Sequence, residues 1–97
     1  MAIVELASFN PQGAHTRNAS LGSVVTLATP ANASYLLIQA LAQNVRYTLD
    51  GTTPTASVGF QLVASDPPLL LSVRGVASVK VIQETTGAEV QYQWGQT

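Results

Sequence analysis

The segment Asn44-Val-Arg-Tyr-Thr-Leu-Asp-Gly-Thr-Thr-Pro-Thr-Ala-Ser-Val-Gly-Phe-Gln-Leu62 decides the fold. Residues 45–49 alternate apolar and polar side chains, which is typical of a strand with one buried face. Residues 58–62 begin a second strand, which we expect to return alongside the first. Arg46 and Asp50 then share a strand face about 13 Å apart, so their partners are expected on neighbouring strands. The segment therefore predicts a β protein.

A turn with well-defined residue types separates these two strands. Glycine accepts the positive φ that a tight turn requires, and a preceding carboxylate can accept hydrogen bonds from the next amides, here those of Thr52 and Thr53. Proline has no amide hydrogen, so pairing with the ladder stops where it occurs. We therefore predict a structural turn formed by Asp50, Gly51, Thr52 and Pro54.

The composition of the whole chain favours strands over helices. Val, Ile and Thr together number 24, whereas Lys and Glu, the usual residues of exposed helix faces, number four. Further strands are expected at residues 3–7, 23–29, 35–42, 58–64, 69–73 and 79–81. Short strands at this spacing predict one domain over residues 1–97, an all-β, small antiparallel β-sandwich (jelly-roll or immunoglobulin-like) with about seven or eight short strands.

The clearest alternation lies near the C-terminal end of the sequence. Apolar and polar side chains occupy opposite faces there: Ala88, Val90, Tyr92 and Trp94 on one, Glu89, Gln91 and Gln93 on the other. One face of this strand is therefore expected to pack and the other to meet water. Thr85-Thr86-Gly87 precedes it and is expected to join it to the strand at residues 79–81 as a short hairpin.

Two segments leave alternatives open. Residues 32–43 fit a helix capped by Asn32 or Ser34, but Tyr35, Leu37 and Leu41 also share one face of a strand. Residues 10–22 contain Pro and Gly and almost no apolar periodicity, which predicts a long loop that either contacts a partner or is disordered. We expect residues 1–22 to form an extended N-terminal arm and loop, with candidate partner contacts at His15, Arg17 and Asn18.

Charge and cysteine content exclude several classes of function. The 97 residues include four basic and five acidic side chains, and 9% of residues are charged against about 25% in ordinary soluble domains. A nucleic-acid or anionic-membrane surface needs concentrated positive charge, so neither partner is expected. No targeting segment is evident at the start, and the apolar stretch at residues 35–42 is too short for a membrane span. A nearly neutral surface instead favours self-association.

The sequence contains no recognisable catalytic or metal-binding constellation. It has no cysteine, and its one histidine, His15, has no acidic residue nearby. The two aspartates, Asp50 and Asp66, both stand beside turn-forming residues, where an aspartate usually accepts backbone hydrogen bonds. We therefore expect a protein that is not an enzyme, with no catalytic residues, no metal site and no cofactor.

The central segment also resembles a known group of proteins, and the similarity extends over residues 36–93. The matching stretches are Arg46-Tyr-Thr-Leu-Asp-Gly-Thr-Thr-Pro-Thr55, Ala56-Ser-Val-Gly59, Ala77-Ser-Val-Lys-Val-Ile-Gln83 and Ala88-Glu-Val-Gln-Tyr92. They resemble short all-β virion structural proteins of tailed double-stranded DNA bacteriophages, which include head decoration or cement proteins. The signature is a turn and a strand pattern, with no chemical site in it.

That resemblance implies a structural component of a phage particle, most simply a capsid decoration protein that binds across capsomer junctions and stabilises the head. The expected partners are the major capsid protein or another virion protein, and further copies of the chain, with a trimer favoured. The expected location is the capsid surface, after synthesis in the host bacterial cytoplasm. A tail, neck or adhesin protein is the alternative within this class.

A second, shorter resemblance covers residues 47–55, Tyr-Thr-Leu-Asp-Gly-Thr-Thr-Pro-Thr. It is similar to a hairpin of the immunoglobulin-like module attached to chitobiase-type glycosidases, which implies a carbohydrate-binding accessory module. Such a module is expected to expose a platform of aromatic rings. The available aromatic residues are Phe9, Tyr35, Tyr47, Phe60, Tyr92 and Trp94, and most of them fall on the faces assigned to the core.

Overall fold

The computed structural model describes residues 10–76 and 78–96. Its regular elements are eight strands, and every pair of them is antiparallel. The strands are β1 (Asn10–Asn18), β2 (Val25–Leu27), β3 (Tyr35–Leu41), β4 (Val45–Thr48), β5 (Phe60–Leu62), β6 (Leu69–Ser72), β7 (Val79–Gln83) and β8 (Glu89–Gln96). The prediction of an all-β antiparallel sandwich is confirmed. The expected strand at residues 3–7 lies outside the described residues, as does Phe9.

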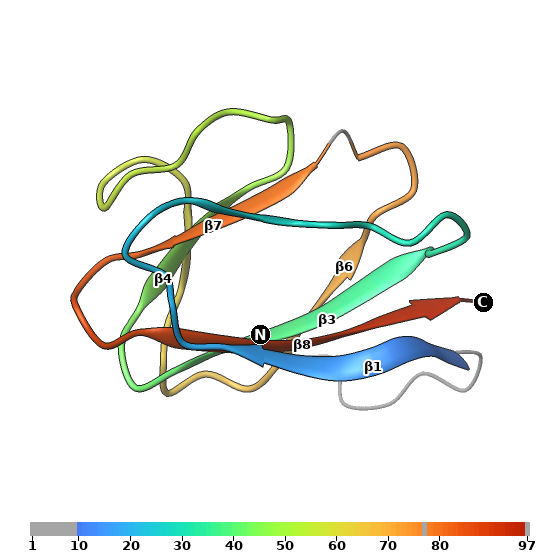
Figure 1. Cartoon of the computed structure of the whole chain (residues 1–97), viewed down its shortest axis with the longest axis horizontal. Helices are drawn as coiled ribbons and strands as arrows, with labels where there is room; N and C mark the ends of the chain where they lie inside the picture. The colour runs from blue at the N-terminus through green and yellow to red at the C-terminus, as the bar shows by residue number, and fades with distance from the viewer. Residues whose placement is uncertain (1–9, 77, 97) are drawn as a thin grey trace.

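The strands form two four-stranded sheets, ordered β1-β8-β3-β6 and β2-β7-β4-β5. One long hairpin, folded at the β4–β5 connection, accounts for the pairings β1–β8, β2–β7, β3–β6 and β4–β5. Wrapping that hairpin into two layers adds the pairings β3–β8 and β4–β7. Figure 1 shows β1 and β8, from opposite ends of the sequence, running side by side. This strand order defines a jelly roll, one of the two sandwich types expected.

The core lies between the two sheets and is made by alternating side chains of both. Leu36, Ile38 and Ala40 of β3 are buried, so this segment is a strand and the helix alternative is wrong. Tyr35, Leu37 and Leu41 do share a face, but it is the outer, partly exposed one. The buried hydrophobic residues are Leu21, Leu27, Leu36, Ile38, Ala40, Val45, Tyr47, Leu62, Val73, Val79, Val81, Ala88, Val90 and Trp94.

The N-terminal part of the expected loop at residues 10–22 is a strand. β1 occupies Asn10–Asn18 and pairs with β8, with a shift of register between Gln12 and Thr16. Pro11 and Gly13 indicated a loop, but an edge strand tolerates proline, and a glycine with φ of +74° fits a bulge. The strand shows little apolar periodicity because most of its side chains are exposed.

The expected β7–β8 hairpin is also wrong. β7 lies in one sheet and β8 in the other, so Thr85-Thr86-Gly87 belongs to a connection that crosses between the layers. Both strands alternate as expected because each covers the same core, from opposite sides. Alternation alone does not reveal which layer a strand joins.

Candidate functional site

The turn after β4 is stabilised by its own side chains. Oδ1 of Asp50 accepts a hydrogen bond from the amide of Thr52 at 3.0 Å, and the Thr48 hydroxyl donates to the Thr52 carbonyl oxygen at 2.5 Å. Gly51 has φ of +88°, and Pro54 is buried. Hydrogen bonds from Thr52, first from its side chain and then from its backbone, lower the pKa of Asp50 below its ordinary 3.8. The partner of the Asp50 carboxylate is thus in its own turn, while the Asp50 backbone forms a β-bridge with Ser78.

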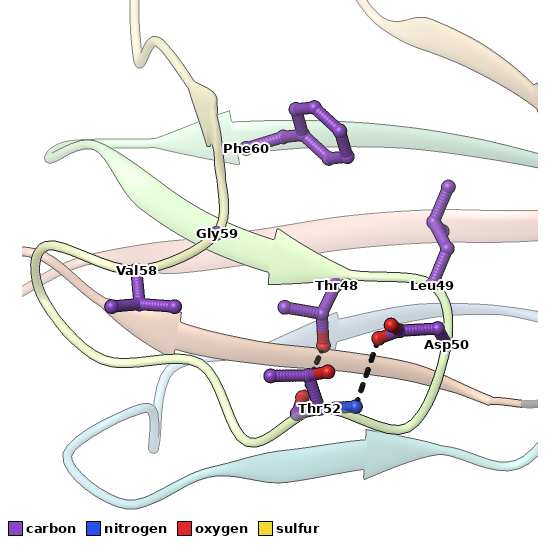
Figure 2. Close-up of a pocket in the computed structure, with 7 residues that line it drawn as sticks. All are labelled: Thr48, Leu49, Asp50, Thr52, Val58, Gly59 and Phe60. Carbon is purple, nitrogen blue, oxygen red and sulfur yellow. Dashed lines mark hydrogen bonds between the residues drawn. The ribbon is translucent and has the colours of Figure 1, made fainter.

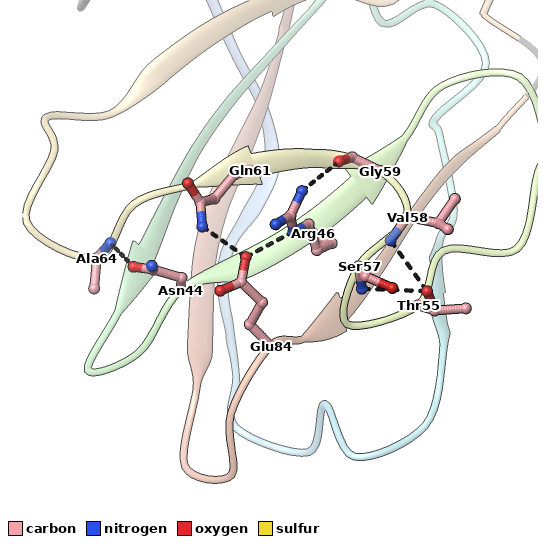
Figure 3. A network of polar contacts seen from close by, with 9 residues as sticks. All are labelled: Asn44, Arg46, Thr55, Ser57, Val58, Gly59, Gln61, Ala64 and Glu84. Atoms are coloured by element: carbon pink, nitrogen blue, oxygen red, sulfur yellow. Dashed lines mark hydrogen bonds and ion pairs between the residues drawn. The ribbon is translucent and has the colours of Figure 1, made fainter.

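A polar network on the outer side of β4 ties three segments together (Figure 3). Nε of Arg46 donates to Oε2 of Glu84 at 2.6 Å, and Nε2 of Gln61 donates to the same oxygen at 2.7 Å. A second guanidinium nitrogen of Arg46 donates to the Gly59 carbonyl oxygen at 3.0 Å. The hydrogen bond from Gln61, followed by the contact with Arg46, lowers the pKa of Glu84 below its ordinary 4.5. The network links β4, β5 and the end of β7, so its role is structural.

A shallow hollow of about 510 Å³ lies next to the Asp50 turn (Figure 2). We call it the β4–β5 hollow. Most of its lining surface is apolar, although three of its side chains are polar, and Phe60 and Val58 are 65% and 48% exposed. Figure 2 shows Leu49 and Phe60 on the same side of the β4 ribbon. The residues that line it are Thr48, Leu49, Asp50, Thr52, Val58, Gly59 and Phe60.

The outward face of the β1-β8-β3-β6 sheet carries a row of hydrogen-bonded side chains. Nε2 of His15 donates to Oε1 of Gln91 at 3.1 Å, and Nε2 of Gln91 donates to Oε1 of Gln39 at 2.8 Å. Gln39 in turn donates to the Asp66 carbonyl oxygen at 3.4 Å. The row therefore crosses β1, β8 and β3 and ends at the β5–β6 connection. We call this surface the outer sheet face; it also includes Leu37, Leu70 and Gln93.

The structure places the three predicted partner contacts in two different settings. His15 and Arg17 both lie on the outer sheet face, where Arg17 forms an ion pair with Glu89 and keeps 63% of its side chain exposed. Oδ1 of Asn18 accepts a hydrogen bond from the amide of Ser20 at 2.7 Å, which shapes the turn after β1. Only His15 and Arg17 are therefore brought together on one surface.

Sequence reasoning missed the β4–β5 hollow because it assigned most aromatic residues to the core. Tyr47 and Trp94 are indeed buried, and the rings of Tyr47 and Phe60 are 5.6 Å apart. Phe60 is on the same side of the sheet as buried Tyr47 but is exposed because β5 is the last strand, and strand alternation does not distinguish an edge from a centre. Among the described aromatic residues Phe60 alone is classed as exposed, so they form no ring platform.

The ionisable side chains of the described residues are dispersed over the surface. Within residues 10–76 and 78–96, no group of three or more His, Asp or Glu side chains is placed to hold a metal ion. The carboxylates of Asp50, Glu84 and Glu89 are each engaged in a separate local contact. No helix in this part of the chain is long and apolar enough to cross a membrane.

The fold and its surfaces define a small jelly-roll domain. It has a neutral outer sheet face on the β1-β8-β3-β6 sheet and the β4–β5 hollow at the β5 edge of the other sheet. Comparison of the chain with protein-family models, with curated proteins and with solved structures finds no match. The domain's class is therefore given by its strand order, and its role has to be argued from its surfaces.

Proposed function

We propose that this protein is a non-enzymatic structural component of a tailed bacteriophage particle. In this role it is a capsid decoration protein that binds the major capsid protein across capsomer junctions and stabilises the head. The sequence resemblance over residues 36–93 and the jelly-roll strand order support this assignment, since jelly rolls recur in viral capsid proteins. Because one fold serves many functions, the surface has to carry the argument.

The observation that carries the proposal is the chemistry of the outer sheet face. The side-chain amides of Gln91 and Gln39 are hydrogen-bonded to each other and that of Gln93 to backbone carbonyl oxygens. The ionised groups Arg17 and Glu89 form a pair. Leu37 and Leu70 lie opposite each other in register and add apolar surface between them. Burying an unpaired charge is costly, whereas this face has its polar groups paired before it meets a partner. It is suited to a broad neutral contact.

Many weak contacts of this kind stabilise a shell through repetition. Each capsomer junction offers the same site, so binding at many junctions adds up without a strong individual contact. A protein that binds the expanded shell, and not the disrupted one, lowers the free energy of the shell by about 2.7 kcal/mol per site at a free concentration one hundred times Kd. The mechanism requires no catalytic group.

The test is binding to purified, expanded empty heads of the phage that encodes the chain. We expect saturable binding in a sedimentation assay and a higher temperature of shell disruption. Gln91→Lys places an unpaired charge in the outer sheet face and is expected to weaken binding, whereas Thr86→Lys adds the same charge in the exposed β7–β8 connection and is expected to leave it unchanged. Absence of binding to heads, or binding only to tails or necks, would overturn the decoration role.

A further inference from the structure

The β4–β5 hollow is an apolar site that the described part of the chain leaves open. Phe60 pairs in register with the buried Tyr47, so its ring lies on the core side of the sheet, yet it is 65% exposed. Leu49 lies on the same side of the β4 ribbon as Phe60, whereas Val58 lines the hollow from the other side of that ribbon (Figure 2). β5 is an edge strand, so one side of its backbone is also free of a neighbouring strand. An exposed aromatic group beside an open strand edge is typical of an interaction site.

We propose that the β4–β5 hollow binds residues 3–9 of a second copy of this chain. This segment, Ile-Val-Glu-Leu-Ala-Ser-Phe, has five apolar residues and one charge, and it precedes the described fold. The strand expected at residues 3–7 suits addition to a sheet edge. Apolar side chains from the segment then fill the space beside Phe60. The inference is independent of the proposed function, because two copies can associate in this way whether or not they bind a shell.

The segment joins the fold at the same end of the sandwich as the hollow. Pro11 and Tyr35 both pair with Gly95, and Tyr35 also pairs with Ser72, so β1 begins at the end where the β6–β7 connection lies. A bridge between Asp50 and Ser78 brings the β4–β5 connection to that same end. The two partners of the proposed contact therefore occupy one end of each molecule.

The length of the segment favours binding to a second copy over binding to the hollow of the same molecule. Short connections join strands that face each other across the two sheets: β1 and β2, β8 and β7, β3 and β4, and β6 and β5. β1 is therefore at one edge of the sandwich and β5 is at the opposite edge. Three strand spacings of about 4.8 Å and a sheet separation of about 10 Å place those edges about 17 Å apart, and a path over the end loops is longer. Leu6 precedes Asn10 by four residues, which span at most about 13 Å. The part of the segment from Leu6 to Phe9 is therefore too short to reach the hollow of its own molecule, and only residues 3–5 lie far enough along the chain to do so.

Charge and symmetry are compatible with this arrangement. The net charge of the chain is −1, so copies repel one another weakly. A segment and a hollow are different surfaces, so the contact is heterologous and generates a closed ring when the rotation between copies allows it. A trimer is one such ring.

The experiment uses the full chain, which has no cysteine and so accepts a single spin label. Ser8→Cys carrying a nitroxide is mixed with unlabelled chains enriched in nitrogen-15, and only the enriched chains are observed by NMR. We expect loss of amide signal intensity in the enriched chains at residues 48–60, since broadening there arises only between molecules. Light scattering on the same sample is expected to report oligomers that dissociate on dilution.

Two substitutions in the enriched chain make the test specific. Phe60→Ser removes the exposed ring, and we expect it to abolish the broadening and to weaken association about tenfold. Leu70→Ser removes a partly exposed apolar residue from the outer sheet face and is expected to preserve both; circular dichroism checks that each variant is folded. The proposal is overturned by a monomer at the NMR concentration, by broadening that appears only when label and isotope are on the same chain, or by broadening that Phe60→Ser leaves unchanged.

Discussion

Gly59 occupies a position at which a side chain would collide with the neighbouring strand. Its φ is +125°, and an added Cβ would lie 3.0 Å from the carbonyl oxygen of Tyr47 and 3.3 Å from its nitrogen. Backbone atoms cannot move aside as the end of a flexible side chain can, so both the conformation and the contact oppose substitution. This glycine allows β5 to approach β4 directly after the turn.

We predict that Gly59→Ala lowers the free energy of unfolding by about 2–4 kcal/mol, as the sum of backbone strain and overpacking. Gly75→Ala is the matched control, because Gly75 also has a positive φ, +78°, but its added Cβ would meet nothing within 4 Å. Its expected cost is about 1–2 kcal/mol. Urea unfolding followed by Trp94 fluorescence measures both. Equal losses would show that the close contact with Tyr47 has no energetic weight.

Glu84 is expected to make the folding stability of the protein depend on pH. Its folded-state pKa lies below the ordinary 4.5, so its ionised form is favoured by folding. The contribution is complete above pH 4.5 and is lost as the pH falls through the lowered value. We predict that the melting temperature falls on acidification in this range, and that Glu84→Gln melts lower at neutral pH but shows a shallower fall. A variant with the wild-type pH dependence would contradict this role for Glu84.

At the scale of the element, β3 shows how alternation positions each side chain. Leu36 is fully buried between the sheets, whereas Leu37 points to the outer sheet face. We predict that Leu36→Ala costs about 2–5 kcal/mol, because it leaves a cavity in the core, and that Leu37→Ala costs less than about 1 kcal/mol. Denaturant unfolding of the two variants tests the alternation directly, and similar losses at both positions would contradict it.

β1 and β5 are both edge strands and use their edges differently. β1 has proline, a bulge and a glycine of positive φ, which are features that discourage further pairing. β5 has only three residues, and one of its two exposed side chains, that of Phe60, is aromatic. The features of β1 prevent another strand from adding to its edge. The short edge of β5 is instead suited to one specific incoming segment.

At the scale of the molecule, the wrapped hairpin makes each sheet from both halves of the sequence. β1 pairs with β8 and β2 pairs with β7, so neither sheet can form before distant segments meet. The two sheets share one core and have no independent interior. Stability is therefore a property of the whole sandwich.

We predict a single cooperative unfolding transition. Trp94 fluorescence reports the β1-β8-β3-β6 sheet, and the NMR methyl signals of Val81 report the other sheet. Both probes are expected to give the same midpoint in urea. Val45→Ala, a substitution in one sheet only, is expected to shift both midpoints by the same amount. Separate midpoints for the two probes would contradict the shared core.

The two proposed contacts use separate parts of this sandwich. The outer sheet face belongs to β1, β8, β3 and β6, and the β4–β5 hollow belongs to the edge of the other sheet. A copy can therefore contact a shell through one surface and a second copy through the other. The substitutions at Gln91 and Phe60 are expected to affect these two activities independently.

The sequence by itself determined the elements whose signals are local. Alternation predicted which side chains of β8 are buried, and the Asp50-Gly51 pair predicted the turn between β4 and β5 and its hydrogen bond to Thr52. These features depend on side-chain period and on backbone conformation within a few residues, so composition and order are enough to reveal them.

Only the tertiary structure decided which strands are neighbours and which are edges. β1 is a strand because β8 supplies its hydrogen bonds, and the β7–β8 connection crosses between layers because both strands cover one core from opposite sides. The exposure of Phe60 and the row from His15 to Gln39 follow from the same pairing. Partners distant in sequence leave no local signal, since pairing is set by how the whole hairpin wraps to bury its apolar faces.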